Sequence, residues 1–301
     1  MNYQIIKNRK FFLSLSILAV VGSILALIFW GLNFGVDFAG GSLMEVKFDN
    51  YQATVTEIQD SLKDANLQNL TIQPTQDSAI LRFKEDSEVI HQAVLGGLQN
   101  LAEAKKTTMT ELQFDSVGPS IGQELKSKSF NSAFIVLLAI ILYISLAFRK
   151  VSRPISSWKY GVTAIIALFH DVLVTLGVFS VLGHFYGIEI NTPFIAAILT
   201  VLGYSVSDTI VVFDRIRENL PKSQDNFEDT INRSVNQTIV RSINTSLSSI
   251  LALAAILFFG GNTIKDFALA LVVGIFVGTY SSIFIASPIL VVWEKAMHRK
   301  K

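Results

Sequence analysis

The chain has 301 residues, of which 50% are hydrophobic and 16% are charged, and its formal net charge is +1. This composition is typical of a membrane protein, and the near-neutral charge excludes a strongly basic nucleic-acid-binding protein. No cysteine is present, which excludes disulfides, thiolate metal sites and a cysteine nucleophile.

The first membrane-spanning helix is predicted at Phe11 to Gly31. This apolar run of about 20 residues is the length that a helix needs to cross roughly 30 Å of hydrocarbon. Lys7, Arg9 and Lys10 precede it, as in a signal peptide. The run exceeds the usual hydrophobic region of about 7 to 15 residues, however, and no A-x-A cleavage site follows. We therefore expect an uncleaved anchor.

Residues 37–128 have the composition of a water-soluble α+β domain. The Gly-rich stretch GVDFAGG, residues 35–41, is expected to be a turn that leads into it. The periodicity predicts strands at Ser42 to Phe48, Leu70 to Ile72, Ile80 to Phe83 and Met109 to Val117, and helices at Thr54 to Ala65 and Glu88 to Ala104. The order β-α-β-β-α-β predicts a ferredoxin-like domain, a fold that hosts many functions.

The remaining part of the chain predicts five further membrane spans. They lie at Ser129 to Phe148, Gly161 to Phe185, Thr192 to Phe213, about Thr238 to Phe259, and Phe267 to Trp293. We therefore expect an α-helical integral membrane protein with six transmembrane helices. Its parts would be residues 1–36 with the first span, an extracytoplasmic domain at 37–128, and spans 2–6 with cytoplasmic loops and tail at 129–301.

Lysine and arginine residues predict the orientation, because they collect in short cytoplasmic loops. The N-terminal tail, the loops 149–159 and 214–234 and the C-terminal tail are basic, whereas the loops 184–191 and 260–266 contain one lysine between them. Both termini are therefore expected in the cytoplasm, with the α+β domain outside.

Asp208 lies inside the fourth span, before the chain returns to water at Asp214. A carboxylate at the centre of a membrane helix costs roughly 2.5 to 3.5 kcal/mol on insertion scales, so it predicts a functional site. Thr200, Tyr204 and Ser207 share its helix face. This polar stripe, with Gly203 beside it, is expected to point into the helix bundle.

Arg241 in the fifth span is the candidate partner of Asp208. It shares one helix face with Thr245, Ser248 and Ser249. Both charges lie in the cytoplasmic third of their spans, although an arginine at that depth can also reach the interface by itself. The sequence cannot place the two helices side by side.

His170 and Asp171 lie roughly 15 Å into the third span at the helical rise. A hydrogen-bonded packing pair and a proton relay are equally consistent with this position. Gly274 and Gly278 in the last span, followed by Ser282, have a four-residue spacing that indicates close helix packing.

These residues favour an ion-driven function. A carboxylate that alternates between its charged and protonated forms can carry a proton part-way across a membrane, and one charge moved across 100 mV is worth about 2.3 kcal/mol. The sequence has no G-x-x-x-x-G-K-[ST] motif and no H-E-x-x-H motif. We therefore expect no enzyme activity and no metal or other cofactor apart from the coupling ion.

Six motifs in the chain resemble the SecD/SecF family of protein-export membrane proteins. They are GVDFAGG at 35–41, VGPSIGQEL at 117–125, FHD at 169–171, VLGYSVSDTIVVFDRIREN at 201–219, VNQTIVRSINTS at 235–246 and GTYSSIFIASP at 278–288. The resemblance covers nearly the whole chain. The short outer domain and the form YSVSDT of the fourth-span motif favour the SecF branch.

The resemblance implies a member of the resistance-nodulation-division superfamily in the bacterial cytoplasmic membrane. Such proteins pair with SecD in a pseudo-symmetric unit and assist the SecYEG channel with SecA. They use the proton-motive force to promote late steps in the export of unfolded secretory polypeptides. Asp208 and Arg241 match the family's fourth-span Asp and fifth-span Arg.

Alternative interpretations remain open at this point. A small-molecule or lipid exporter of the same superfamily is one, although an outer domain of about ninety residues is small for a cavity-forming module. A structural scaffold for SecD without ion coupling is another. An intramembrane protease would need a paired Asp or a Ser-His site, which the spacing does not supply. The coupling ion is expected to be the proton, with sodium as the alternative.

Overall fold

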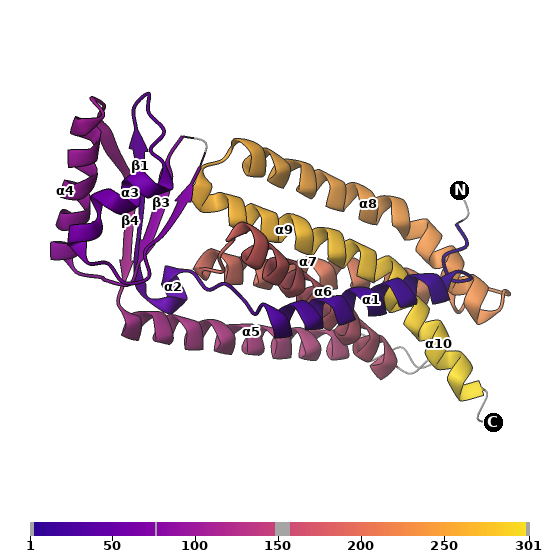
Figure 1. Ribbon diagram of the computed structural model, residues 1–301. Coiled ribbons are helices and arrows are strands. Elements are labelled where there is room, and N and C mark those ends of the chain that lie inside the picture. Colours follow the sequence, from indigo (N-terminus) through magenta and orange to yellow (C-terminus); the bar gives the residue numbers. More distant parts are fainter. Residues whose placement is uncertain (1–2, 76, 148–156, 299–301) are drawn as a thin grey trace. The chain divides into compact units, whose positions relative to one another are not determined.

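The computed structural model describes residues 3–75, 77–147 and 157–298 (Figure 1). Its contacts divide the chain into two compact units. We call Phe34–Phe130 the sheet unit, and Met1–Asn33 with Asn131–Lys301 the helical unit. The predicted basic loop at 149–159 falls largely outside the described residues, as do residues 299–301 of the basic C-terminal tail.

Long helices build the helical unit. They are α1 (Arg9–Phe29), the greater part of α5 (Pro119–Ala147), α6 (Ser157–Tyr186), α7 (Thr192–Asn219), α8 (Phe227–Phe259), α9 (Asn262–Ser281) and α10 (Ser287–His298). A π-helical turn, Ser282–Ala286, joins α9 to α10. In the described part of the chain six helical segments are long and apolar enough to span a membrane, which confirms the predicted number of spans.

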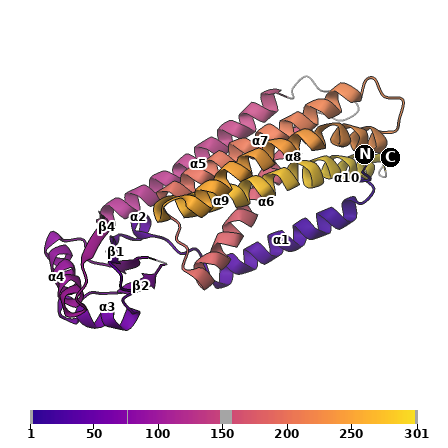
Figure 2. The same ribbon diagram turned by 90° about the horizontal axis from the view of Figure 1, so that it is seen from above.

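Helix α9 holds the helical unit together, because it packs against α6, α7 and α8 (Figures 1 and 2). The core beside it is apolar and contains fully buried aromatic side chains, among them Tyr160 and Phe213. These two rings meet edge to face with centroids 5.2 Å apart. Aromatic rings bury large apolar areas, so they contribute strongly to the packing energy of a core.

Both ends of the chain meet the start of α8 within the helical unit. Glu228, in the first turn of α8, forms ion pairs with Arg9 of α1 and Lys295 of α10. Nearby, the Tyr3 amide donates to Oδ1 of Asn236 at 2.7 Å. The N-terminal segment, the start of α8 and the end of α10 therefore lie at one end of this unit (Figure 2).

The sheet unit is a small α+β fold around four antiparallel strands. Its elements are β1 (Gly41–Phe48), α3 (Val55–Ser61), η1 (Lys63–Ala65), β2 (Thr71–Pro74), β3 (Ala79–Phe83), α4 (Glu88–Ala104) and β4 (Met109–Val117). The strand order is β2-β3-β1-β4. All four predicted strands and both predicted helices are present. The apolar faces of α3 and α4 bury Ile58, Val94 and Leu98 against β1 and β3.

The predicted turn at residues 35–41 contains a short helix, α2 (Val36–Ala39), followed by two glycines with positive φ. A Cβ atom on Gly40 would lie 2.9 Å from Cα of Pro119, and one on Gly41 would lie 2.5 Å from the carbonyl oxygen of Phe83. Any other residue would therefore be strained in both conformation and space. Gly40 and Gly41 therefore allow the beginning of the sheet unit to pack against Phe83 and Pro119.

Candidate intramembrane site

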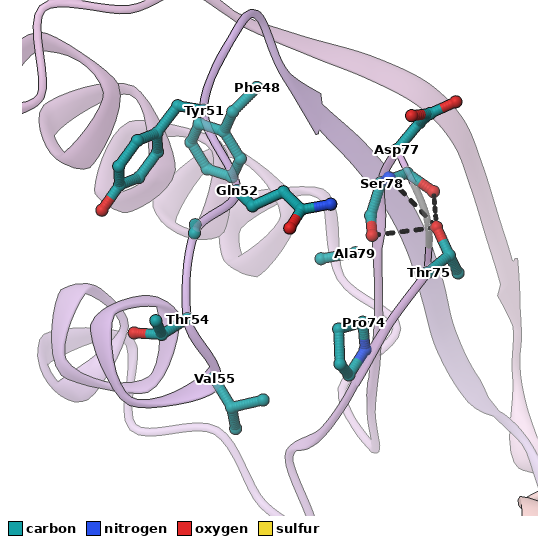
Figure 3. A pocket seen from close by; sticks show the side chains of 11 residues that line it. Phe48, Tyr51, Gln52, Thr54, Val55, Pro74, Thr75, Asp77, Ser78 and Ala79 are labelled. Carbon is teal, nitrogen blue, oxygen red and sulfur yellow. Dashed lines mark hydrogen bonds between the residues drawn. The ribbon is translucent and has the colours of Figure 1, made fainter.

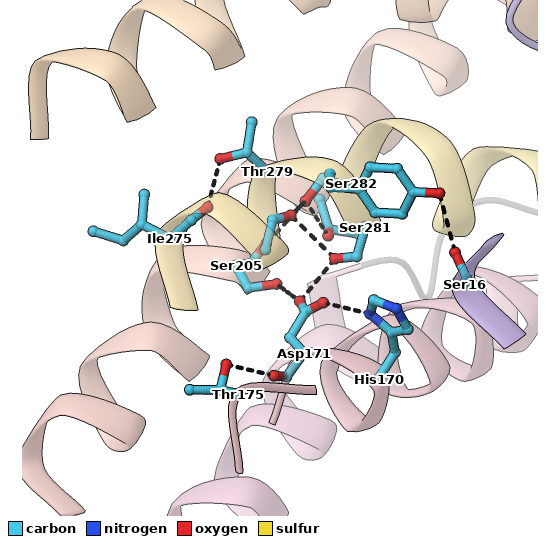
Figure 4. A network of polar contacts seen from close by, with 12 residues as sticks. Ser16, His170, Asp171, Thr175, Ser205, Ile275, Thr279, Ser281 and Ser282 are labelled. Atoms are coloured by element: carbon cyan, nitrogen blue, oxygen red, sulfur yellow. Dashed lines mark hydrogen bonds and ion pairs between the residues drawn. The ribbon is translucent and has the colours of Figure 1, made fainter. Parts of the chain in front are cut away.

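Asp171 is the most completely bound carboxylate of the helical unit (Figure 4). It is fully buried in α6. Its Oδ1 accepts from Nδ1 of His170 at 3.0 Å. Its Oδ2 accepts from Oγ of Ser205 in α7 at 2.5 Å and from Oγ of Ser281 in α9 at 2.7 Å. Because each donor satisfies part of a buried charge, Asp171 joins three helices.

His170 has one ring nitrogen in this network and one outside it. A proton on Nδ1 makes its contact with Asp171 a hydrogen bond to a carboxylate. Nε2 is buried and has no hydrogen-bond partner among the described residues. The predicted pair is therefore hydrogen-bonded, and this geometry is consistent with both packing and relay.

Asp208 is half-buried in α7 and only partly satisfied. Its Oδ1 accepts from Oγ of Ser242 in α8 at 2.5 Å. Its Oδ2 is buried and has no hydrogen-bond partner in the part of the chain that the structure describes. A buried carboxylate oxygen without a donor is costly when the group is charged, so this oxygen is the natural place for a proton.

Arg241 does not reach Asp208. Helices α7 and α8 pack side by side, but the α8 residue that meets the carboxylate is Ser242, whereas Arg241 is exposed. Within residues 157–298, which the structure describes, no ion pair joins Arg241 to Asp208. Arg241 instead lines a cavity of about 150 Å³ together with Thr238, Asp214 and other polar residues of α7 and α8.

The predicted polar stripe of α7 is oriented differently from our expectation. Thr200 and Ser207 are exposed, and Gly203 faces open space within this chain. The prediction that they point into the bundle of this chain is wrong. The buried stripe of α7 is mostly apolar, and Ser205 and Thr209 belong to it. Thr245 of α8 is likewise exposed, and its hydroxyl donates to the carbonyl of Arg241.

Two glycines of α9 bring its backbone close to α7. A Cβ on Gly274 would lie 2.2 Å from Cγ2 of Val201, and one on Gly278 would lie 3.0 Å from Cβ of Ser205. Small residues at these positions permit close approach of the two helices. The approach carries Ser281 and Ser282 to the carboxylate network.

Sequence reasoning missed the serines whose hydroxyls donate to the two carboxylates: Ser205 and Ser281 at Asp171, and Ser242 at Asp208. A signal was available in α8, where Ser234, Thr238, Ser242 and Ser246 recur every four residues and are buried. The face that contains Arg241 and Thr245 was favoured because of its charge. Burial, which decides which face packs inward, is set by the neighbouring helices.

No metal site competes with this interpretation: the described residues contain no group of three His, Cys, Asp or Glu side chains that could hold an ion. The sheet unit has a separate cavity of about 230 Å³, lined among others by Phe48, Tyr51, Pro74, Thr75 and Ser78 (Figure 3). Its lining offers apolar surface and hydroxyl groups without a cluster of catalytic side chains.

Comparison with known proteins assigns the family. Residues 98–296 match the family described as protein export membrane protein SecD/SecF, C-terminal, and residues 26–51 match the SecD/SecF GG motif. The latter contains Gly40 and Gly41.

Curated relatives match nearly the whole chain. The protein translocase subunit SecF of Thermobaculum terrenum is 42% identical, with coverage of 97% of this chain and 94% of the relative. The SecF of Anaerolinea thermophila is 39% identical, with coverage of 98% and 96%.

A solved structure has the same fold. The crystal structure of SecDF, a translocon-associated membrane protein from Thermus thermophilus, aligns with a TM-score of 0.84 and 32% identity. The alignment covers 98% of this chain but 39% of the SecDF chain, so this chain spans about two-fifths of that protein. The resemblance indicated by the six motifs is confirmed: the chain is a multi-pass membrane protein that belongs to the SecF branch of the SecD/SecF family.

Proposed function

We propose that this chain is a Sec translocase subunit that uses the proton-motive force to promote late steps of protein export. The observation that carries the proposal is Asp208, an intramembrane carboxylate with one oxygen bound by Ser242 and the other buried without a donor among the described residues. The chain would act without enzyme chemistry, and its coupling ion would be the proton, with sodium as the alternative.

The chemistry follows from the unequal environment of the two oxygens. Charged Asp208 is stabilised at Oδ1 and uncompensated at Oδ2, so proton binding at Oδ2 removes the cost of a buried negative charge. Proton release restores that cost. One charge moved through 100 mV is worth about 2.3 kcal/mol, so a few protons can bias a conformational equilibrium.

A cavity of about 150 Å³ beside Arg241 lies between α7 and α8, one turn further along α7 than Asp208. It is lined by ionisable groups of α7, namely Asp214, Arg215 and Glu218. Arg241 on its wall is one helical position from Ser242, which donates to Asp208. A rotation of α8 by about 100°, the angle between neighbouring residues of a helix, would bring the guanidinium toward the carboxylate, where it would favour the charged form. His170 and Asp171 would serve as relay or packing residues.

The partner is proposed to be SecD. Gly203 and Ser207 of α7 and Arg241, Asn244 and Thr245 of α8 are exposed in this chain, although they lie within candidate spans. Lipid cannot satisfy an arginine or hydroxyl groups, and small residues mark helix interfaces in membranes. A second set of helices covering this face fits these side chains, and the SecDF chain contains far more residues than this one.

The orientation is proposed from charge, with the protein in the cytoplasmic membrane of a bacterium. Both chain ends lie at one end of the helical unit with the start of α8, where Arg9, Glu228 and Lys295 meet. The basic residues nearby support a cytoplasmic position for that end. The sheet unit would be ferredoxin-like and would lie outside the cell membrane. It would contact unfolded polypeptide that SecA has delivered to SecYEG and that is leaving the channel.

The test is export of a secretory precursor into inverted vesicles that contain this chain, SecD, SecYEG and SecA at fixed ATP, with and without an ion gradient. The gradient should accelerate export with the wild type and not with Asp208→Asn. Asp225→Asn is the control, because it removes an exposed carboxylate that pairs with Arg233 and does not line the cavity beside Arg241. Equal acceleration with wild type and Asp208→Asn would contradict the proposal and favour a scaffold.

A further inference from the structure

We infer that Ser281 and Ser282 couple the two intramembrane carboxylates, so that the protonation state of Asp171 changes the proton affinity of Asp208. Ser281 is the last residue of α9, and Ser282 begins the π-helical turn. Both are fully buried. The inference deepens the proposed function, since it assigns positioning residues to the same site.

Ser281 belongs to the Asp171 side of the network (Figure 4). Its Oγ donates to Oδ2 of Asp171 at 2.7 Å, beside the hydroxyl of Ser205. The same Oγ lies 3.0 Å from the carbonyl oxygen of Gly278, which is its alternative acceptor. A hydroxyl has one hydrogen to donate, so Ser281 can serve Asp171 or Gly278 but not both fully.

Ser282 belongs to the Asp208 side. Its Oγ lies 2.9 Å from Oγ1 of Thr209, the residue after Asp208. Its own alternative acceptor is again the carbonyl of Gly278, at 2.9 Å. The two serines therefore share one acceptor.

Gly278 cannot serve both hydroxyls well. Its carbonyl oxygen already accepts the backbone amide of Ser282, and a carbonyl has two lone pairs. When Asp171 is charged, Ser281 donates to it and leaves Gly278 to Ser282. When Asp171 is protonated, it needs fewer donors, so Ser281 turns to Gly278 and displaces Ser282. The hydrogen of Ser282 is then free for Thr209 or Asp208.

The π-helical turn gives this exchange room to occur. π-helical turns are rare, occur as single turns within α-helices and concentrate at functional sites. This turn begins at the shared serine pair and follows Gly278, where α9 approaches α7 closely. Rearrangement of the turn would move Ser282 relative to α7, as the exchange of hydrogen-bond partners requires.

The other titratable groups around the pair are few. They are His170 of α6, which contacts Asp171, Tyr204 of α7, which donates to Ser246, Tyr280 of α9, whose ring lies beside His170, and the exposed Arg241 of α8. Helix α1 contributes Ser16, which has no charge. The serine pair connects the two sides through Ser281, which donates to Asp171, and Ser282, which contacts Thr209 beside Asp208.

The test is infrared titration of the carboxyl bands of the full chain with SecD in lipid vesicles, with bands assigned by Asp171→Asn and Asp208→Asn. The carboxamide introduced by Asp171→Asn cannot carry a negative charge, so this variant reproduces the protonated state of Asp171. In the wild-type background this substitution should shift the titration midpoint of Asp208 by about one pH unit, the size expected for interacting groups. In a Ser281→Ala background the shift should largely vanish.

Two further variants keep the result decisive. Ser281→Thr retains the hydroxyl and should restore the shift, which a merely structural role would not require. Ser287→Ala is the matched control, because Ser287 is equally buried and its Oγ has no hydrogen-bond partner among the described residues. A full shift with Ser281→Ala, or its loss with Ser287→Ala, would overturn the inference. The titration requires no export, so the two proposals can fail separately. The shift in the Asp208 midpoint can be absent while Asp208 is essential for gradient-driven export, and it can be present while Asp208→Asn exports normally.

Discussion

The hydroxyl of Ser242 donates to Oδ1 of Asp208 at 2.5 Å, and Arg241, one residue earlier, is exposed on another face of α8. The carboxylate therefore rests on a neutral donor in this conformation of the chain. A hydroxyl stabilises the charged form less than a guanidinium does, so the approach of Arg241 proposed above would favour the charged form of Asp208.

Ser242→Ala should impair ion coupling. A hydrogen bond to a charged group is worth about 1.5 to 3 kcal/mol, so its loss should change the proton affinity of Asp208 about tenfold or more. The gradient-dependent part of precursor export should fall accordingly, while export driven by ATP alone is unchanged. Ser248→Ala is the control, because that hydroxyl is exposed and donates to its own helix. The same loss with both variants would argue against a specific role of Ser242.

Gly274→Ala should loosen the contact between α7 and α9. The new methyl group would meet Val201 at 2.2 Å, and overpacking of this kind costs about 1 to 3 kcal/mol. Thermal unfolding in detergent should show a lower midpoint, and adding Val201→Ala should recover part of it. Gly203→Ala should not lower the midpoint, because no atom lies within 4 Å of that position. A lower midpoint for Gly203→Ala alone would contradict this packing.

Asp171→Ala should destabilise the helical unit more than Asp171→Asn. Alanine removes the acceptor of three donors from His170, Ser205 and Ser281, and each buried unsatisfied group costs about 1 to 3 kcal/mol. Asparagine keeps one carboxamide oxygen as an acceptor. Thermal unfolding of both variants in the same detergent measures the difference. Equal midpoints would show that these hydrogen bonds do not hold α6, α7 and α9 together.

Glu57 should make the sheet unit sensitive to acid. Hydrogen bonds from Lys105, the Thr54 backbone and Tyr51 lower the pKa of this carboxyl to about 2. A lowered pKa stabilises the folded state above the ordinary value near 4.5, and this contribution is lost as the pH falls toward 2. Amide exchange over residues 54–62 should accelerate in that range beyond its intrinsic rate. Glu57→Gln should remove the extra acceleration, and its persistence would assign the effect to another group.

Much of the fold follows from local pattern. In the sheet unit, Thr54 and Ser87 cap the two helices, and alternating residues such as Met44 and Val46 face one core, so the sequence carries the signals for each element. The six spans were predictable because roughly 20 apolar residues in succession have few alternatives to crossing a membrane.

The orientation of side chains in the membrane was less accessible. Asp208 could be recognised because a charged side chain is costly anywhere in a membrane span. Ser205 and Ser282 add little cost to a span, so their roles become visible only once the neighbouring helices are known. The rotation of α7 and α8 depends on which helices pack against them. The polar residues that remain exposed, Ser207 and Arg241 among them, fit a face reserved for another subunit.

The measurement that tests the central claim most directly is ion flux, with pH- and sodium-sensitive dyes, in vesicles that contain this chain with SecD and SecYEG during export. The account predicts proton uptake with the wild type and with Asp225→Asn, and none above background with Asp208→Asn. Sodium flux with the same dependence would identify sodium as the ion. Undiminished flux with Asp208→Asn would contradict the claim that this carboxylate carries the coupling ion.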